Sequence, residues 1–169
     1  MEPVTAEPFA YASPARRALA AFIDYFVVSF LASPFAGGAS QRFAEAVFDG
    51  KTPDGGDFAQ LTVATVLTIV VYSTAMHAWR GATFGKIAAR TTLVNDDGSR
   101  VSPAAAFVRS VALAVIFFAS TFALSVPLLL NALRPIWNRR RQTWHDSLAR
   151  TIVVRADSLP AASPGRSEG

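Results

Sequence analysis

The chain of 169 residues contains no cysteine and only two histidines. The lack of cysteine excludes disulfides, thiolate metal sites and cysteine nucleophiles. Charged residues make up only 17% of the chain, whereas 51% of the residues are hydrophobic. This composition is typical of a membrane protein. No internal repeat is evident, which argues against the duplicated halves of many complete transporters.

Three apolar segments organise the chain, at about residues 18–36, 58–79 and 107–133. Each reaches or nearly reaches the roughly 20 residues that a helix needs to cross the hydrocarbon core of a bilayer. The first segment could instead be a cleaved signal peptide, but Asp24 in its middle argues against cleavage. The segments predict an all-α polytopic membrane protein.

The distribution of basic residues predicts the orientation in the membrane. The loop 37–57 holds two basic and four acidic side chains, so we expect it outside the cytoplasm. The amino terminus with Arg16 and Arg17, and the second loop, are then cytoplasmic. A single straight crossing by the third segment would export the seven arginines after residue 133. The charge bias opposes that arrangement, so the carboxyl terminus is also expected in the cytoplasm.

The third apolar segment allows two interpretations. It can enter the membrane and return as a re-entrant or hairpin form, broken near Ser125 and Pro127, because proline removes a backbone donor and disfavours helix before it. Each limb would then be too short to span and its turn would face protein or water. Alternatively, Pro127 only kinks a single third span. We favour the returning form.

Short strands are expected beside the membrane domain. Asp97 and Gly98 are a strong hairpin signal, flanked by strand-forming residues at 91–94 and by Val101. Residues 151–154 have the same character, so these pieces predict a small cytoplasmic β element. The predicted organisation is a flexible segment 1–14, a membrane domain 15–155 and a disordered tail 156–169.

Asp24 is the first candidate site residue, because an ionisable group within a membrane span is costly, by roughly 2.5–3.5 kcal/mol at the helix centre. Arg17 lies seven residues earlier, on the same helix face. In a structural interpretation Asp24 is neutralised by Arg17, Arg109 or another buried donor. In a functional interpretation Asp24 loads and releases a proton or cation, with His77 as an accessory group.

The basic segment near the carboxyl end holds further candidates. His145 and Asp146 have no third metal ligand at a recognisable spacing. We expect Asp146 to cap a helix start or to pair with one of Arg139, Arg140 and Arg141. Amphipathic tryptophan rings and cationic side chains favour contact with anionic lipid headgroups, and the candidates are Trp137, Trp144, Lys86, Arg139, Arg140 and Arg141. The basic residues cluster at segment ends, so nucleic acid is not expected as a partner.

Four separated pieces carry a family resemblance: RRALAAFIDYF, GATFGKIAARTTLVNDDGSRVS, AAFVRSVAL and RRRQTWHDSLARTIVV. Together they resemble the RDD family of small bacterial membrane proteins, over about residues 11–155. That family is named after an arginine and an aspartate in the first membrane helix and a second aspartate near the carboxyl end. Arg17, Asp24 and Asp146 match those positions, whereas Arg150 stands where the family more often has glycine.

The resemblance implies a multi-pass protein of the bacterial inner membrane, for which a transport role has been suggested. One hypothesis is that the chain takes part in moving a cation, a proton or a small solute, with Asp24 titrating and Arg17 tuning it. The alternative is a non-catalytic scaffold or accessory subunit. No nucleophile with a base, metal site or cofactor motif is visible, so an enzyme is not expected. The expected partners are lipids and a second copy or another membrane subunit.

Overall fold

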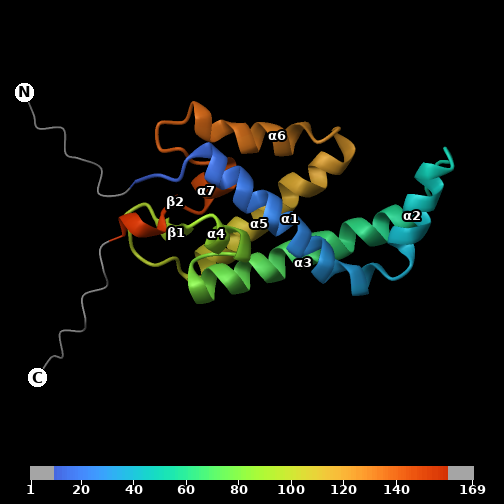
Figure 1. The fold of residues 1–169 in the computed structure, drawn as a ribbon, viewed down its shortest axis with the longest axis horizontal. Coiled ribbons are helices and arrows are strands. Elements are labelled where there is room, and N and C mark those ends of the chain that lie inside the picture. Colours follow the sequence, from blue (N-terminus) through green and yellow to red (C-terminus); the bar gives the residue numbers. More distant parts are fainter. Residues whose placement is uncertain (1–9, 160–169) are drawn as a thin grey trace, which may run out of the picture.

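The computed structural model describes residues 10–159 as a bundle of long helices with a small sheet at one end (Figure 1). Three helices are long and apolar enough to cross a membrane: α1 (Pro14–Ala36), α3 (Gly55–Arg80) and α5 (Pro103–Phe122). These helices confirm the predicted all-α polytopic class. The described chain begins and ends beside the sheet, so we refer to the sheet end and the far end of the bundle.

Local signals determine where the long helices begin. Ser13 caps α1 by accepting a hydrogen bond from the Arg16 amide, and Asp54 caps α3 by accepting from the amides of Gly56 and Asp57. Ser102 caps α5, and Pro103 follows it at the first helical position, where its missing N–H costs nothing. This cap starts the third helix four residues before the apolar run at 107.

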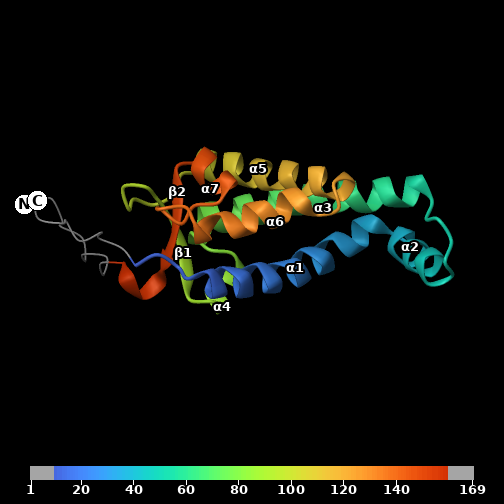
Figure 2. The same cartoon turned by 90° about the horizontal axis from the view of Figure 1, so that it is seen from above.

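The third apolar segment turns back on itself. Leu124 and Ser125 adopt positive φ angles of 48° and 62°, and Pro127 lies in the first turn of α6 (Val126–Leu133). The chain therefore turns where the sequence predicts, and α6 packs on α5 and runs back toward the sheet end (Figure 2). The prediction that both limbs are too short is wrong for α5, which has 20 residues. Only α6, with eight residues, is too short to span.

The loop at the far end contains a helix that the sequence does not predict, α2 (Ala39–Phe48). Arg42 on α2 donates from Nε to Asp57 in the first turn of α3, at 3.0 Å. This ion pair ties α2 to the start of α3. The apolar side chains of Val47 and Phe48 remain exposed at this end.

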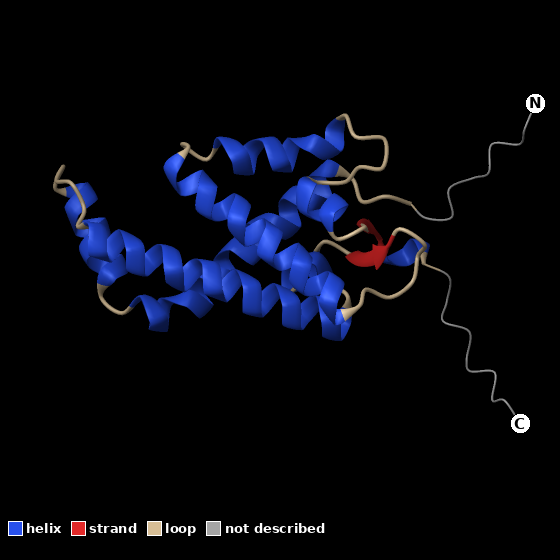
Figure 3. Ribbon diagram, turned by 180° about the vertical axis from the view of Figure 1, so that it is seen from behind, coloured by secondary structure: helices blue, strands red, loops and turns tan. Residues whose placement is uncertain are grey.

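The sheet has two strands, β1 (Thr91–Asn95) and β2 (Thr151–Arg155), paired antiparallel with Leu93 opposite Val153 (Figure 3). The predicted pairing of residues 91–94 with 151–154 is therefore present. The predicted hairpin is only partly formed, because the residues after Gly98 contribute a single bridge between Val94 and Arg100. The Leu93 amide instead donates to the Gly81 carbonyl, at 2.8 Å, so that edge of β1 is already occupied.

Two short helices lie between the sheet and the bundle. Helix α4 (Phe84–Ala88) packs on α1 and β1, and α7 (Trp144–Leu148) packs on α5 and β2. We call these two helices and the sheet the cap layer. The predicted flexible segments 1–14 and 156–169 lie mostly outside the described residues. In their described parts, Tyr11 forms a β-bridge with Val154, and Ala156–Ser158 forms a 3-10 turn.

The absence of cysteine allows a direct test of this topology. We expect Ser99→Cys, in the turn after β1, and Arg139→Cys, after α6, to react with an impermeant maleimide from the same side of the membrane. Lys51→Cys, between α2 and α3, should react from the other side. Labelling of Arg139→Cys and Lys51→Cys from one side would contradict the return of the chain through α6.

Candidate functional site

Asp146 is the centre of a buried polar network at the start of α7. The Asp146 amide donates to the Thr143 side chain at 3.3 Å, and the Thr143 amide donates to Asp146 Oδ2 at 3.2 Å. This reciprocal capping box confirms the expectation that Asp146 caps a helix. Its side chain is fully buried, so its charge must be compensated within the protein.

Two arginines from distant helices compensate the Asp146 carboxylate. Arg17 on α1 donates from Nη1 to Oδ2 at 3.1 Å, and Arg109 on α5 donates from Nε to Oδ1 at 3.0 Å. The expected partners Arg139, Arg140 and Arg141 do not fill this role: all three are exposed, and Arg140 contacts Asp96 at 3.4 Å. The carboxylate thereby joins the starts of α1 and α5 to α7.

The electrostatics of the network favour ionised Asp146 and neutral His145. Burial raises the pKa of Asp146, but the charges of Arg109 and Arg17 and the hydrogen bond with Thr143 outweigh it and hold that pKa well below its usual range. Burial, reinforced by the charge of Arg109, lowers the pKa of His145 to about 3. A guanidinium group can only donate, so His145 Nε2 accepts from Arg109 Nη2, at 3.0 Å.

Asn131 on α6 connects the returning limb to the same network. Its Nδ2 contacts His145 Nδ1 at 3.1 Å, and its Oδ1 accepts from the Trp144 amide at 2.9 Å. The side chain is 3% exposed, although it lies within an otherwise apolar helix. Asn131 therefore fixes α6 against the first residues of α7.

Asp24 forms a second and separate site. Its Oδ1 accepts hydrogen bonds from the Tyr72 hydroxyl at 2.8 Å and from the Gly85 amide at 2.9 Å, and its Oδ2 accepts from the Thr83 hydroxyl at 2.6 Å. The Tyr72 hydroxyl in turn accepts from the Phe84 amide at 2.9 Å. One half-buried carboxylate thus connects α1, α3 and the start of α4.

The expected link between Arg17 and Asp24 is absent from the described residues 10–159. Helix side chains lean toward the amino terminus, and Arg17 precedes Asp24 by two turns, so its guanidinium extends away from the carboxylate. It reaches Asp146 and donates to the carbonyls of Ala12 and Val153 at 3.4 and 3.2 Å. The donors that satisfy Asp24 are uncharged.

Gly85 is the point at which α4 meets α1. A Cβ atom at this position would overlap the carbonyl oxygen of Ala20 and lie 2.8 Å from Asp24 Cγ. The absence of a side chain allows the Gly85 amide to reach the carboxylate. The close approach also leaves no space for an ion between Gly85 and Asp24.

Lys86 and His77 do not take part in the hydrogen bonds of either carboxylate among the described residues. The sequence predicts Lys86 at lipid phosphates, but its side chain is half-buried, and burial together with the charge of Arg109 lowers its pKa to about 7. His77 is 1% exposed. Within the described part of the chain, neither nitrogen of its ring has a hydrogen-bond partner, and nor does Thr74 Oγ1.

The other predicted lipid-contacting residues are exposed. Trp137 and Trp144 are 65% and 39% exposed, and the three consecutive arginines lie in the exposed connection between α6 and α7. Large apolar side chains are also exposed along α1, as lipid contact requires: Phe22, Tyr25, Phe26, Phe30 and Phe35. Lipid binding by these residues stays a prediction.

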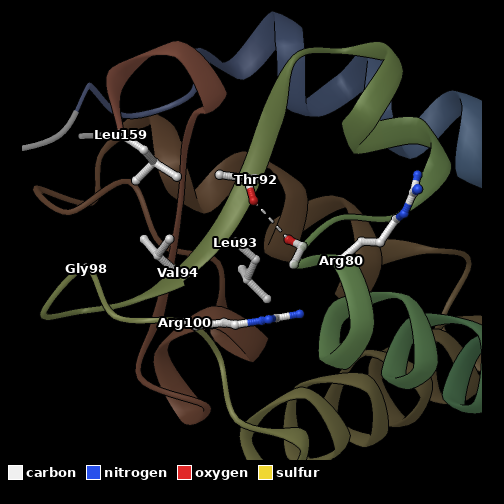
Figure 4. Close-up of a pocket in the computed structure, with 8 residues that line it drawn as sticks. Arg80, Thr92, Leu93, Val94, Gly98, Arg100 and Leu159 are labelled. Atoms are coloured by element: carbon white, nitrogen blue, oxygen red, sulfur yellow. Dashed lines mark hydrogen bonds between the residues drawn. The ribbon is translucent and has the colours of Figure 1, made fainter. Parts of the chain in front are cut away.

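A shallow cleft of about 250 Å³ lies between the end of α3 and β1. Its two arginines do not converge: Arg80 points away, whereas Arg100 reaches the end of α3 and donates to the Trp79 carbonyl (Figure 4). The dashed contact in this view joins Thr92 to the Gly81 carbonyl, at 3.2 Å. The cleft is smaller than the roughly 300–1,000 Å³ of most small-molecule sites.

The sequence did not single out Tyr72, Thr83, Gly85 or Asn131 as site residues. A local signal existed for Thr83, which precedes α4 as an N-cap, and for Asn131, a polar residue in an apolar helix. No group of three potential His or carboxylate metal ligands occurs among residues 10–159. The polar groups described above connect helices of the bundle to the cap layer.

The comparisons with known proteins identify the family of this chain. The model of the RDD family matches residues 11–150, so the chain belongs to the RDD family. Two of the residues that name the family, Arg17 and Asp146, contact each other, and the third, Asp24, makes the separate site. No similar curated protein and no similar solved structure was found.

Gly85→Ala should destabilise the protein severely, because the added methyl group collides with backbone and cannot be moved aside by a rotamer change. Overpacking of this kind costs about 1–3 kcal/mol or more. The matched variant Gly55→Ala has no atom within 4 Å of the new methyl group and should be neutral. Thermal unfolding in detergent measures both, and equal stabilities would contradict the close packing of α4 on α1.

Arg109→Met should lower stability by about 3–5 kcal/mol, because it leaves a buried carboxylate with one arginine fewer. In an Asp146→Asn background the same change should cost much less, since no charge is then left uncompensated. The exposed Arg139→Met provides the control and should change stability by less than about 0.5 kcal/mol. Additive effects of Arg109→Met and Asp146→Asn would show that the pair is not coupled.

Stability should fall as the pH drops below about 6.5, the ordinary pKa of histidine. The unfolded chain then gains a proton at His145, whereas the folded protein holds this ring neutral down to about pH 3. Each pH unit in this window contributes at most ~1.4 kcal/mol. His145→Gln should flatten this part of the curve of melting temperature against pH, and an unchanged slope would contradict a neutral buried imidazole.

Proposed function

We propose that this RDD family membrane protein is a non-catalytic scaffold or accessory subunit and does not move a solute by itself. In this proposal the helices anchor the chain in the bacterial inner membrane and hold the cap layer at the cytoplasmic surface for another membrane subunit. The observation that carries the proposal is that both carboxylates, Asp24 and Asp146, are used by donors from other elements of the chain.

Cation loading at Asp24 would require the site to come apart. A transported cation needs free oxygen ligands, but both oxygens of Asp24 already accept hydrogen bonds from two hydroxyl groups and an amide. Freeing them would separate Thr83 and Gly85 from α1 and displace α4. A half-buried carboxylate with both oxygens engaged by donors from other elements supports a structural role.

The packing between Asp24 and the far end also supports the scaffold. Val28, Ile69 and Ala114 form an apolar cluster between α1, α3 and α5, and a second cluster of Ala32, Ala36 and Ala64 follows it. Close-packed apolar side chains give a cation or proton no ligands along this stretch.

Transport is the second candidate, and a specific observation favours it. Asp24 lies midway along a helix of membrane length, and His77 is buried on the neighbouring helix α3. Intramembrane ionisable groups often mark a proton or ion path. In this candidate the protein would move a cation, a proton or a small solute, with a second copy or another subunit completing the path.

Reconstituted protein separates the two candidates. Proteoliposomes that contain a pH-sensitive dye are pulsed with sodium, potassium or lithium, beside vesicles with equally inserted Asp24→Asn. The scaffold proposal predicts no cation-dependent proton movement in either sample, and a lower melting temperature for Asp24→Asn, by an amount that corresponds to about 1–3 kcal/mol. Proton movement by the native protein that disappears in an equally stable Asp24→Asn variant would support transport instead.

A further inference from the structure

The cap layer is built from two copies of one unit. Each copy is a short helix followed by a strand, α4 with β1 and α7 with β2, and each residue of the second copy lies 60 positions after its counterpart. A threonine side chain caps each helix. Positive φ angles precede and follow each helix, at Gly81, Arg90, Arg141 and Arg150. Because such angles are uncommon outside glycine, their recurrence shows that the two copies share one backbone path.

Hydrogen bonds between the two copies follow an approximate two-fold rotation. The Asp96 amide donates to the Arg150 carbonyl at 3.1 Å. Its counterpart, the Ala156 amide, donates to the Arg90 carbonyl, also at 3.1 Å. The antiparallel ladder likewise pairs the middle residue of β1 with the middle residue of β2. A rotation that exchanges the two strands therefore also exchanges α4 with α7.

The long helices obey the same rotation. Tyr11, just before α1, bridges to Val154 of β2. Arg100, just before α5, bridges to Val94 of β1, which is the counterpart of Val154. Each long helix then begins with a serine cap and a proline, and a later helix returns toward the sheet, α3 after α1 and α6 after α5 (Figure 2). The described chain thus consists of two related halves, although their side chains differ too much for the sequence to predict a repeat.

The two returning helices differ in length, and this difference leaves one side of α1 uncovered. Helix α3 has 26 residues and packs along α5 of the other half, whereas α6 has eight residues. The rotation would place α6 along α1 in the same way, but the main packing partner of α6 is α5. Of the apolar window of α1, 11% is buried, against 28% for α3 and for α5. Helix α1 therefore lacks the neighbour that its counterpart α5 has.

Side chains on this side of α1 are exposed where their counterparts on α5 are buried. Ser110 and Ala114 are 0% and 3% exposed, and Ala114 packs in the apolar cluster that includes α3. Their counterparts, counted from the serine caps of the two helices, are Ala21, which is exposed, and Tyr25, which is 63% exposed. Exposed neighbours extend this surface along α1, and we call it the open face: Ala18, Ala21, Phe22, Tyr25 and Ser29.

The open face fits a second helix better than it fits lipid. Tyr25 and Ser29 place two hydroxyl groups within a span, whereas tyrosine that contacts lipid is favoured at the level of the headgroups. Ala18, Phe22, Tyr25 and Ser29 alternate spacings of four and three, which form the seam of a left-handed pair of parallel helices. Two copies of one membrane protein in the same orientation have parallel α1 helices, and a two-fold pair uses the same face twice.

We propose that the open face of α1 binds the open face of a second copy of this chain. The α1 helix of the partner then covers the side of α1 that the short α6 leaves open. Tyr25 lies beside Tyr25 of the partner subunit, and the Ser29 hydroxyl is one turn away as a hydrogen-bond partner. This inference lies beyond the proposed scaffold function and does not depend on it.

Cysteine cross-linking tests the contact, because the chain has no cysteine. Tyr25→Cys should form a disulfide-linked dimer when membranes that hold the full chain are oxidised with copper phenanthroline. The control Val115→Cys lies on α5 at the same depth, one position beyond the counterpart of Tyr25, and Val115 is 60% exposed. It should stay monomeric. Equal cross-linking at both positions, no cross-linking of Tyr25→Cys, or its linkage only to another protein would overturn the proposal.

Sedimentation of the purified full chain in a neutral detergent measures the affinity. The native chain should sediment as two copies of 18.0 kDa. Tyr25→Ala should raise the dissociation constant at least about tenfold, because it removes an aromatic side chain from the centre of the contact, whereas Val115→Ala should leave the constant unchanged. Both variants should keep the circular dichroism spectrum of the native chain. A single-copy mass for the native chain would assign the open face to lipid, and a dimer of equal affinity in Tyr25→Ala would place the contact elsewhere; either result contradicts the proposal.

Discussion

The ion pairs of Asp146 with Arg17 and Arg109 are the interaction on which the rest of the arrangement depends. The carboxylate joins residues that are 129 and 37 positions away in the chain. It also caps α7, and α7 leads directly into β2, so the position of the sheet follows from this one buried charge. A buried ion pair adds little net stability, but the loss of one partner is costly because it leaves a buried charge uncompensated. The ion pairs of Asp146 therefore favour this one arrangement of α1, α5 and α7.

Asp24 attaches the other half of the cap layer by different chemistry. It uses hydroxyl groups and an amide as donors, and these place α4 against α1 without a counter-ion. The arginines are consequently committed to Asp146, and Lys86 is left with no carboxylate of its own. The two aspartates therefore hold different parts of the cap layer, one through ion pairs and the other through uncharged donors.

Much of the fold could be predicted because it follows from local signals. Apolar length predicts α1, α3 and α5, the turn at Ser125 and Pro127 follows from proline, and the cap at Asp146 follows from its position after Thr143. Helix α2 escaped prediction because its sequence is amphipathic rather than apolar.

The partners of the charged residues could not be predicted, because helix spacing alone suggests that Arg17 faces Asp24. Only the tertiary fold brings Arg17 to Asp146 and Tyr72 to Asp24, which lie 129 and 48 residues apart. The family resemblance names Arg17, Asp24 and Asp146 but carries no information about which of them touch. The unpartnered state of His77 likewise depends on what surrounds it in space, which no sequence pattern encodes.

Hydrogen exchange of the backbone amides in native protein and in Asp24→Asn tests most directly whether the aspartates hold the cap layer on the helices. The account predicts faster exchange in residues 83–89 of the variant, where α4 loses its contact with α1, and unchanged protection in α7 and β2, which depend on Asp146. Equal protection of α4 in both proteins would contradict a structural role for Asp24.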